Sequence, residues 1–256
     1  MPLDIAAALS GRLRPPLAIV LGSPREAADL AALAGGEETA CYQMDLYQAD
    51  RLRENLAERK LEALVLTGSD LWSLPANFQT VVYQAPERGE RQLKLDMIEQ
   101  AFHLLRPHGS IIVLSPYEID AFFPTILKKI FGKFQAPAVG NGMMFLAQRD
   151  GDRPRRRHEV HFHGRFGDGP SFRFLSRPGV FSFGRFDNGA RALVETMVVE
   201  PGNHVLDLGC GCGTNGICAA RLAGPEGQIT FVDSNWTGLP KMAAWAEKLG
   251  NQSTSA

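Results

Sequence analysis

The chain has 256 residues, of which 45% are hydrophobic and 21% charged, so it suits one large or two small globular domains and not a disordered polymer. Its formal net charge of −1 excludes a chain-wide basic field, and any nucleic-acid contact must come from a local patch. No apolar run approaches the length of a membrane span, and we expect no signal peptide at the amino terminus.

Strands and helices alternate in the first half, which we expect to form a domain over residues 1–150. Short apolar runs bounded by turn residues predict strands at Leu17–Leu21, Cys41–Met44, Ala63–Thr67, Phe78–Tyr83, Ser110–Leu114 and Met143–Gln148. Amphipathic stretches predict helices at Glu26–Leu33, Ala49–Arg59, Arg88–Leu105 and Ile119–Phe131. This alternation predicts an α/β domain with a parallel, doubly wound sheet.

The first predicted strand is not followed by a glycine-rich turn. The sequence after Leu21 is Gly-Ser-Pro, and Pro24 lacks the backbone N–H that a ligand-binding turn would offer. We therefore expect a binding or scaffolding domain without a cofactor motif.

A basic, turn-rich stretch over residues 151–178 is expected to be a connector. Arg155, Arg156, Arg157 and Arg165 are candidate contacts for RNA phosphates, and nearby phenylalanines could stack on bases. A merely solvated linker is the alternative.

Within the connector, residues His158–Gly164 alternate in the manner of a strand. His161 and His163 would share one face of it, either as metal ligands or as a solvated strand edge. No metal site is expected.

The most informative stretch is His204–Ile217, in which a short apolar run leads into a glycine-rich turn. Asp207 is expected at the carboxyl end of the strand. Gly209, Gly211 and Gly213 form the turn, where glycine allows unusual backbone angles and a close approach of ligand to backbone. A predicted helix, Thr214–Leu222, would add free N–H groups and a partial positive charge. A short helix over Ala190–Met197 is expected to precede this stretch.

The cysteines show no spacing typical of a disulfide framework. They are Cys41, Cys210, Cys212 and Cys218, and three of them crowd the turn and its helix. We expect a reducing, cytoplasmic environment. A zinc site is disfavoured because a single residue separates Cys210 from Cys212.

Two ligand classes compete for the turn. Gly211, Gly213 and Gly216 complete the dinucleotide pattern G-x-G-x-x-G, so glycine spacing alone does not decide. Asp207 favours a ligand with an ammonium group over a pyrophosphate. A second strand, Gln228–Asp233, ends in an acid that suits a ribose diol. Together these acids favour S-adenosylmethionine, with a nicotinamide cofactor or a turn that serves only packing as alternatives.

The D-x-G-x-G-x-G pattern resembles motif I of class I methyltransferases. With the preceding Gly179-Val-Phe-Ser, Asp187 and Gly189, it resembles the bacterial small-subunit ribosomal RNA guanine-N2 methyltransferases. The resemblance implies a Rossmann-like methyltransferase fold, with a degenerate N-terminal domain and an S-adenosylmethionine-binding domain over residues 179–256. It also implies that Phe181, Asp187 and Gly189 lie beside the cofactor. A helix N-cap at Asp187 would use the same residues.

The chain departs from that family after its second acidic strand. Members of the family continue to an Asn-Pro-Pro-Phe motif that holds the exocyclic amine of the target guanine, and no such motif occurs here. We expect a C-terminally truncated form with an incomplete second domain and name no catalytic residue. The leading hypothesis is an S-adenosylmethionine-dependent RNA methyltransferase. The alternative is a non-catalytic fragment that binds RNA or the ribosome.

Overall fold

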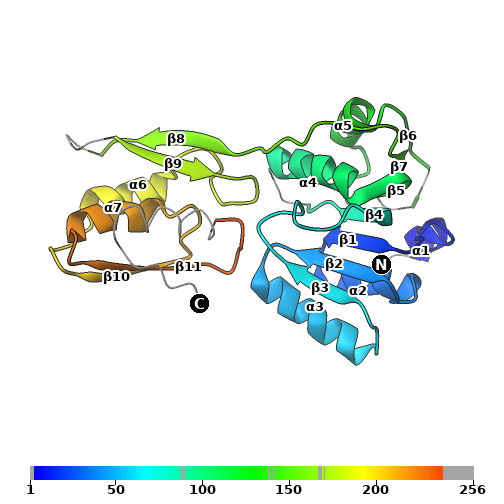
Figure 1. Cartoon of the computed structure of the whole chain (residues 1–256), viewed down its shortest axis with the longest axis horizontal. Coiled ribbons are helices and arrows are strands. Elements are labelled where there is room, and N and C mark those ends of the chain that lie inside the picture. The colour runs from blue at the N-terminus through cyan, green and yellow to red at the C-terminus, as the bar shows by residue number, and fades with distance from the viewer. Residues whose placement is uncertain are drawn as a thin grey trace. The chain divides into compact units, whose positions relative to one another are not determined.

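The computed structural model describes residues 3–87, 90–137, 139–140, 142–166, 169 and 171–238. The chain divides into two compact units, Met1–Arg157 and His158–Ala256, and each is described by itself (Figure 1). Among the described residues, none of the helices combines the length and hydrophobicity that a membrane span requires.

The first unit is an α/β domain, as the alternating pattern predicted. Its helices are α1 (Leu3–Leu9), α2 (Pro24–Leu33), α3 (Leu46–Glu58), α4 (Arg91–Leu104) and α5 (Phe122–Phe131). Its strands are β1 (Leu17–Leu21), β2 (Thr39–Gln43), β3 (Leu64–Thr67), β4 (Phe78–Gln84), β5 (Leu105–Ser115), β6 (Phe134–Gln135) and β7 (Met143–Gln148).

These strands form one seven-stranded sheet in the order β3-β2-β1-β4-β5-β7-β6. Strands β1 to β5 are parallel, whereas β7 runs antiparallel to both β5 and β6. The expectation of a wholly parallel sheet was therefore wrong at this edge. After α5 the chain returns to the sheet as the short strand β6 at its edge. It then reverses direction, and β7 enters between β6 and β5, antiparallel to both.

The sheet is buried on both faces. Alternate residues of each strand point to opposite sides, so Ala18 and Val20 join the cluster under α4 and α5, whereas Leu17 and Ile19 join the cluster with α1, α2 and α3. Burial on both sides explains why the central strands are continuous apolar runs. The same runs made β1 and β7 predictable to the residue.

Some helix boundaries differ from expectation for local reasons. Helix α2 begins two residues early because Ser23 and Glu26 form a reciprocal capping box, with Pro24 in the first turn. Helix α3 likewise begins early, where Asp45 accepts a hydrogen bond from the Gln48 amide. The expected start of α4 at Arg88 lies outside the described residues. Helix α1 and strand β6 were not predicted.

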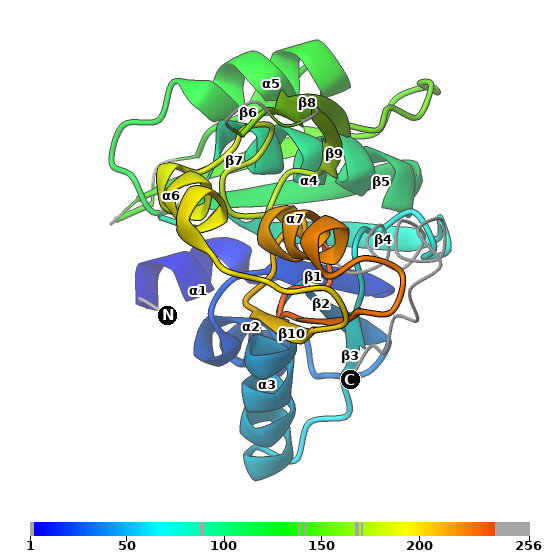
Figure 2. The same cartoon turned by 90° about the vertical axis from the view of Figure 1, so that its left-hand side faces the viewer.

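The second unit contains a hairpin and a strand–helix–strand unit. Its elements are β8 (Val160–Gly164), β9 (Phe172–Ser176), α6 (Asn188–Thr196), β10 (His204–Leu208), α7 (Thr214–Ala223) and β11 (Gln228–Val232). Strands β8 and β9 pair antiparallel, and β10 and β11 pair parallel. Figures 1 and 2 show α6 and α7 on the same side of the β10–β11 pair.

The hairpin is part of the core of the second unit. Phe162 of β8 and Phe174 of β9 cluster with Ile217 and Ala220 of α7 and with Phe231 of β11. The stretch 151–178, expected to be a connector, thus contains two packed strands, and β9 was missed altogether. The sequence also allows a helix from Pro240 to about Leu249, but these residues fall outside those that the structure describes.

Candidate functional site

A cavity of about 510 Å³ opens in the second unit beside the glycine-rich turn. Its walls come from the loop after β9, from the turn between β10 and α7, and from the residues after β11. Of the predicted cofactor residues, it is lined by Phe181, Asp187, Gly209, Gly211 and Asp233. Gly189, Asp207 and Gly213 do not line it.

The turn uses its glycines as the sequence predicted. Gly209, Gly211 and Gly213 have φ angles of 73°, 53° and 77°, in the left-handed region that glycine adopts without steric cost. Gly213 is also the N-cap of α7 and, having no side chain, forms no cap hydrogen bond of its own. Thr214 and Asn215, the first two residues of α7, line the cavity, so a ligand there lies at the positive end of the helix dipole.

Asp233 joins the acidic strand end to the turn. Its Oδ2 accepts a hydrogen bond of 2.7 Å from the Gly211 amide, and its Oδ1 accepts one of 2.8 Å from the Asn235 amide. The Asn235 side chain in turn donates to the Gly179 carbonyl at 3.1 Å. These bonds hold together all three segments of the cavity wall. A carboxylate has about four lone-pair positions, so Asp233 keeps acceptor capacity for a ligand.

Asp207 does not line the cavity, and its carboxylate binds the start of α7. Its Oδ2 accepts from the Gly216 amide at 2.8 Å, so it anchors the first turn of α7 against β10. Burial raises the pKa of the Asp207 carboxyl, and the negative charge of Asp233 adds to the increase. The closeness of this packing depends on Gly216, since a Cβ there would lie 2.3 Å from the Phe231 ring.

Asn215 is a site residue that the sequence reasoning did not single out. It lines the cavity at the start of α7, and its buried Oδ1 has no hydrogen-bond partner in the described part of the chain. An unsatisfied buried acceptor is costly, so a ligand that donates a hydrogen bond here would be stabilised. Its place directly after Thr214, at the predicted helix start, was the available signal.

The loop before α6 contributes an exposed aromatic side chain and a helix cap. Phe181 is 79% exposed at the cavity. Asp187 Oδ2 accepts from the amides of Gly189 at 2.8 Å and Ala190 at 3.1 Å. The N-cap alternative for Asp187 is therefore correct, and the same residue also lines the cavity. Arg185, which the sequence reasoning passed over, brings a cation to this wall.

The cysteines of the turn are not poised for nucleophilic chemistry. Cys210 and Cys212 line the cavity, and burial raises the pKa of their thiols to about 12 and about 11. Both thiols are protonated at neutral pH, which weakens them as nucleophiles and as metal ligands. His161 and His163 are exposed on one face of β8, in the predicted alternation. Within the described ranges, no three potential metal ligands come together.

The candidate RNA-binding arginines fall in both units, with Arg155, Arg156 and Arg157 at the end of the first and Arg165 in the second. Arg155 lies over the Trp72 ring at 5.3 Å, in the first unit. Arg165, in the second unit, donates to the Gly169 carbonyl at 3.1 Å. Arg156 and Arg157 are exposed. The structure thus shows local roles for Arg155 and Arg165 and leaves the other two side chains at the surface.

Comparison with known proteins finds a family model that matches most of the second unit. Residues 171–251 match the model of the methyltransferase small domain. Ribosomal RNA small subunit methyltransferase C of Pseudomonas entomophila is 46% identical over 66 residues, which are 26% of this chain and 19% of that protein. Its counterpart in Stutzerimonas stutzeri is 40% identical over 73 residues, or 28% of this chain and 21% of that protein. The matched stretch therefore spans about a fifth of the length of these relatives.

A solved structure matches the whole fold. The T. thermophilus 16S rRNA N2 G1207 methyltransferase, solved with AdoMet and guanosine, has a TM-score of 0.71 and 20% identity, covering 99% of this chain and 69% of its own. At this identity the likeness establishes the Rossmann-like methyltransferase fold, as expected from the sequence. The resemblance inferred from the motifs is confirmed to this extent: residues 171–251 match the methyltransferase small domain, and the similar proteins are ribosomal RNA small subunit methyltransferases.

Proposed function

We propose that the second unit binds S-adenosylmethionine beside the Gly209–Gly213 turn and that the protein is a methyltransferase acting on guanine N2 of ribosomal RNA. The observation that carries this proposal is the bond from the Gly211 amide to Asp233, because it brings the acidic strand end against the glycine turn in one cavity. The names of the relatives support the RNA substrate.

The residues present fit this cofactor. The free lone pairs of Asp233 suit the two hydroxyls of a ribose. Asn215 Oδ1, buried and without a partner among the described residues, suits a donor such as the ammonium group. Asp207 and Asp233 place negative charge near the turn, which favours a cationic ligand. The α7 amides suit a carboxylate.

When bound, S-adenosylmethionine supplies an electrophilic methyl group on its sulfonium. The chain's own contribution is to hold and orient: Asp233 and the turn fix the ligand, and the exposed Phe181 ring can cover it from solvent. Rate enhancement would come from positioning the acceptor amine, with no covalent enzyme intermediate. We assign no catalytic residue, and we place the protein in the cytoplasm, where its RNA substrate lies.

A second candidate function is a non-catalytic RNA- or ribosome-binding protein. The first unit favours it, because this unit forms a seven-stranded sheet whose first strand is not followed by a glycine-rich turn. Under this alternative the cavity of the second unit is the remnant of a cofactor site and no longer binds a cofactor. RNA binding would then ignore the cofactor and weaken with salt.

Calorimetric titration with S-adenosylhomocysteine, with NADH in parallel, tests the proposal. We expect micromolar binding of S-adenosylhomocysteine and none of NADH. Binding of NADH without binding of S-adenosylhomocysteine would support a nicotinamide site. No binding of either by a folded chain would favour the non-catalytic alternative.

A further inference from the structure

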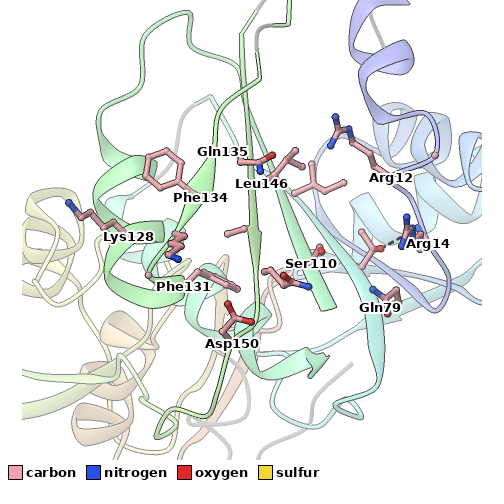
Figure 3. Close-up of a pocket in the computed structure, with 17 residues that line it drawn as sticks. Arg12, Arg14, Gln79, Ser110, Lys128, Phe131, Phe134, Gln135, Leu146 and Asp150 are labelled. Carbon is pink, nitrogen blue, oxygen red and sulfur yellow. Dashed lines mark hydrogen bonds between the residues drawn. The ribbon is translucent and has the colours of Figure 1, made fainter. Parts of the chain in front are cut away.

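We propose that a second cavity, in the first unit, binds single-stranded RNA along its phosphate backbone. This cavity measures about 800 Å³ and is separate from the candidate cofactor site (Figure 3). The inference extends the proposed function to substrate capture. It does not rest on the cofactor, because RNA binding can be measured without one.

The cavity lies at the amino ends of the central parallel strands. Gln79 and Thr80 begin β4, Ser110 belongs to β5, and Leu146 and Gln148 end the antiparallel β7. Cofactors of open parallel sheets bind at the opposite, carboxyl ends of the strands. The position therefore suits a role other than that of a degenerate cofactor pocket.

The lining is strongly basic. It contains the cations Arg12, Arg14, Lys128 and Lys133, all exposed, and a single acid, Asp150. None of the four cations forms an ion pair with a described residue, whereas Asp150 has His108 at 3.6 Å. Four cations without carboxylate partners attract anions, and in a chain of net charge −1 they form a local patch of the kind that RNA binding requires.

The cations lie on opposite sides of the cavity. Arg14 is fixed beside β4, where its amide donates to Thr80 Oγ1 at 3.1 Å, whereas Lys128 belongs to α5. Figure 3 shows Arg12 and Arg14 on one side, Lys128 on the other, and Leu146 and Ser110 between them. A single phosphate would be held by converging cations. Cations on two sides fit successive phosphates of one strand crossing the cavity.

The floor between the cations suits unpaired bases. Phe134 and Leu146, both partly exposed, supply apolar surface, and Ser110 and Gln135 supply a hydroxyl and an amide. Bases of a single strand can turn toward such a surface, whereas paired bases of an RNA duplex are not accessible in this way. We therefore infer a single strand as the ligand.

The basic stretch that the sequence singled out contacts the helix that carries Lys128. Arg153 donates to the Ile130 carbonyl at 2.7 Å, at the C-terminal end of the helix that carries Lys128. The exposed Arg156 and Arg157 follow within the same stretch. Arg156 lines a small pocket together with Ile130 and Arg153, so this cation also lies near the end of α5.

The test is fluorescence anisotropy of a labelled oligouridylate with the full chain at several salt concentrations. Lys128→Glu is compared with Lys129→Glu, because these neighbours on α5 are both exposed and only Lys128 lines the cavity. We expect Lys128→Glu to weaken binding by about fivefold or more and to reduce the salt slope by about 0.7, and Lys129→Glu to change affinity by less than about twofold. The same comparison is made on the other side of the cavity with Arg14→Glu and Arg25→Glu. Both arginines are exposed, and only Arg14 lines the cavity.

Equal losses in the matched variants, or no RNA binding by the wild-type chain, would overturn the proposal. So would tighter binding of duplex RNA or of anionic lipid vesicles that shows the same dependence on Lys128. Asp233→Ala separates this site from the proposed function: oligouridylate binding should persist in this variant even where S-adenosylhomocysteine binding is lost. Circular dichroism confirms that each variant is folded.

Discussion

Asp233 accepts a hydrogen bond of 2.7 Å from the amide of Gly211, across 22 residues of sequence. This contact fixes the turn after β10 relative to the end of β11. Asp233 also lines the cavity, so one side chain both holds the wall together and keeps acceptor positions beside the cavity.

Replacement of Asn215 tests which ligand group lies at the start of α7. Asn215→Leu removes the buried acceptor and should weaken S-adenosylhomocysteine binding by about tenfold, the value of about one charge-assisted hydrogen bond. Asn215→Asp keeps an acceptor oxygen and should bind at least as tightly as wild type. Calorimetry measures both variants, and a large loss in Asn215→Asp would contradict an ammonium group at this position.

Replacement of Gly216 tests the packing of α7 on the strands. A Cβ at this position would lie 2.3 Å from the Phe231 ring and 2.9 Å from Asp207 Oδ2. Gly216→Ala should therefore lower the free energy of unfolding of the second unit by about 1–3 kcal/mol, as overpacking does. Denaturant unfolding measures this loss. Adding Phe231→Leu to Gly216→Ala should recover part of this loss, because the smaller side chain makes room for the Cβ. If the double variant loses the sum of the two single losses, the steric explanation is wrong.

The raised pKa of Asp207 makes a prediction about pH. Because the folded state holds this proton more tightly than the unfolded chain, ionisation of Asp207 costs stability as the pH rises from the ordinary value of 3.8 through the raised pKa. The free energy of unfolding of wild type minus that of Asp207→Asn should thus be highest at acidic pH and fall across that window. Urea unfolding over a pH series measures the difference, and a difference that grows with pH would refute the assignment.

The hairpin should be energetically part of the second unit. Phe174 is 1% exposed and packs with α7 residues, so Phe174→Ala should cost about 3–5 kcal/mol. His163→Ala, on the exposed face of the same hairpin, should cost less than about 0.5 kcal/mol. Hydrogen exchange of peptides from β10 to β11 reports the effect. Unchanged protection in Phe174→Ala would mean that the hairpin is only a linker.

Much of this architecture could be read from the sequence. Strands β1 and β7 were predicted to the residue because continuous apolar runs bounded by turn residues indicate burial on both faces. Strand β9 was missed because Phe172-Arg-Phe-Leu lies in a stretch dominated by arginine and glycine. The antiparallel direction of β7 depends on its pairing partner, which local periodicity does not encode.

The site was predictable in its composition but not in its hydrogen bonding. Glycine spacing and a strand ending at Asp233 identified the turn and one wall of the cavity. The orientation of Asp207 toward the Gly216 amide, behind the turn, depends on how α7 packs against β10. The unpaired acceptor of Asn215 likewise emerges only from the burial of the folded helix.

The most direct test of the account is calorimetric binding of S-adenosylhomocysteine to the wild-type chain, to Asp233→Ala and to Asp233→Asn. Wild type should bind at micromolar concentration, Asp233→Ala should lose at least about tenfold in affinity, and Asp233→Asn, which keeps one acceptor oxygen, should lie between them. Circular dichroism must show all three folded. Equal affinity in all three, or no binding by the folded wild-type chain, would contradict the assignment of this cavity to S-adenosylmethionine.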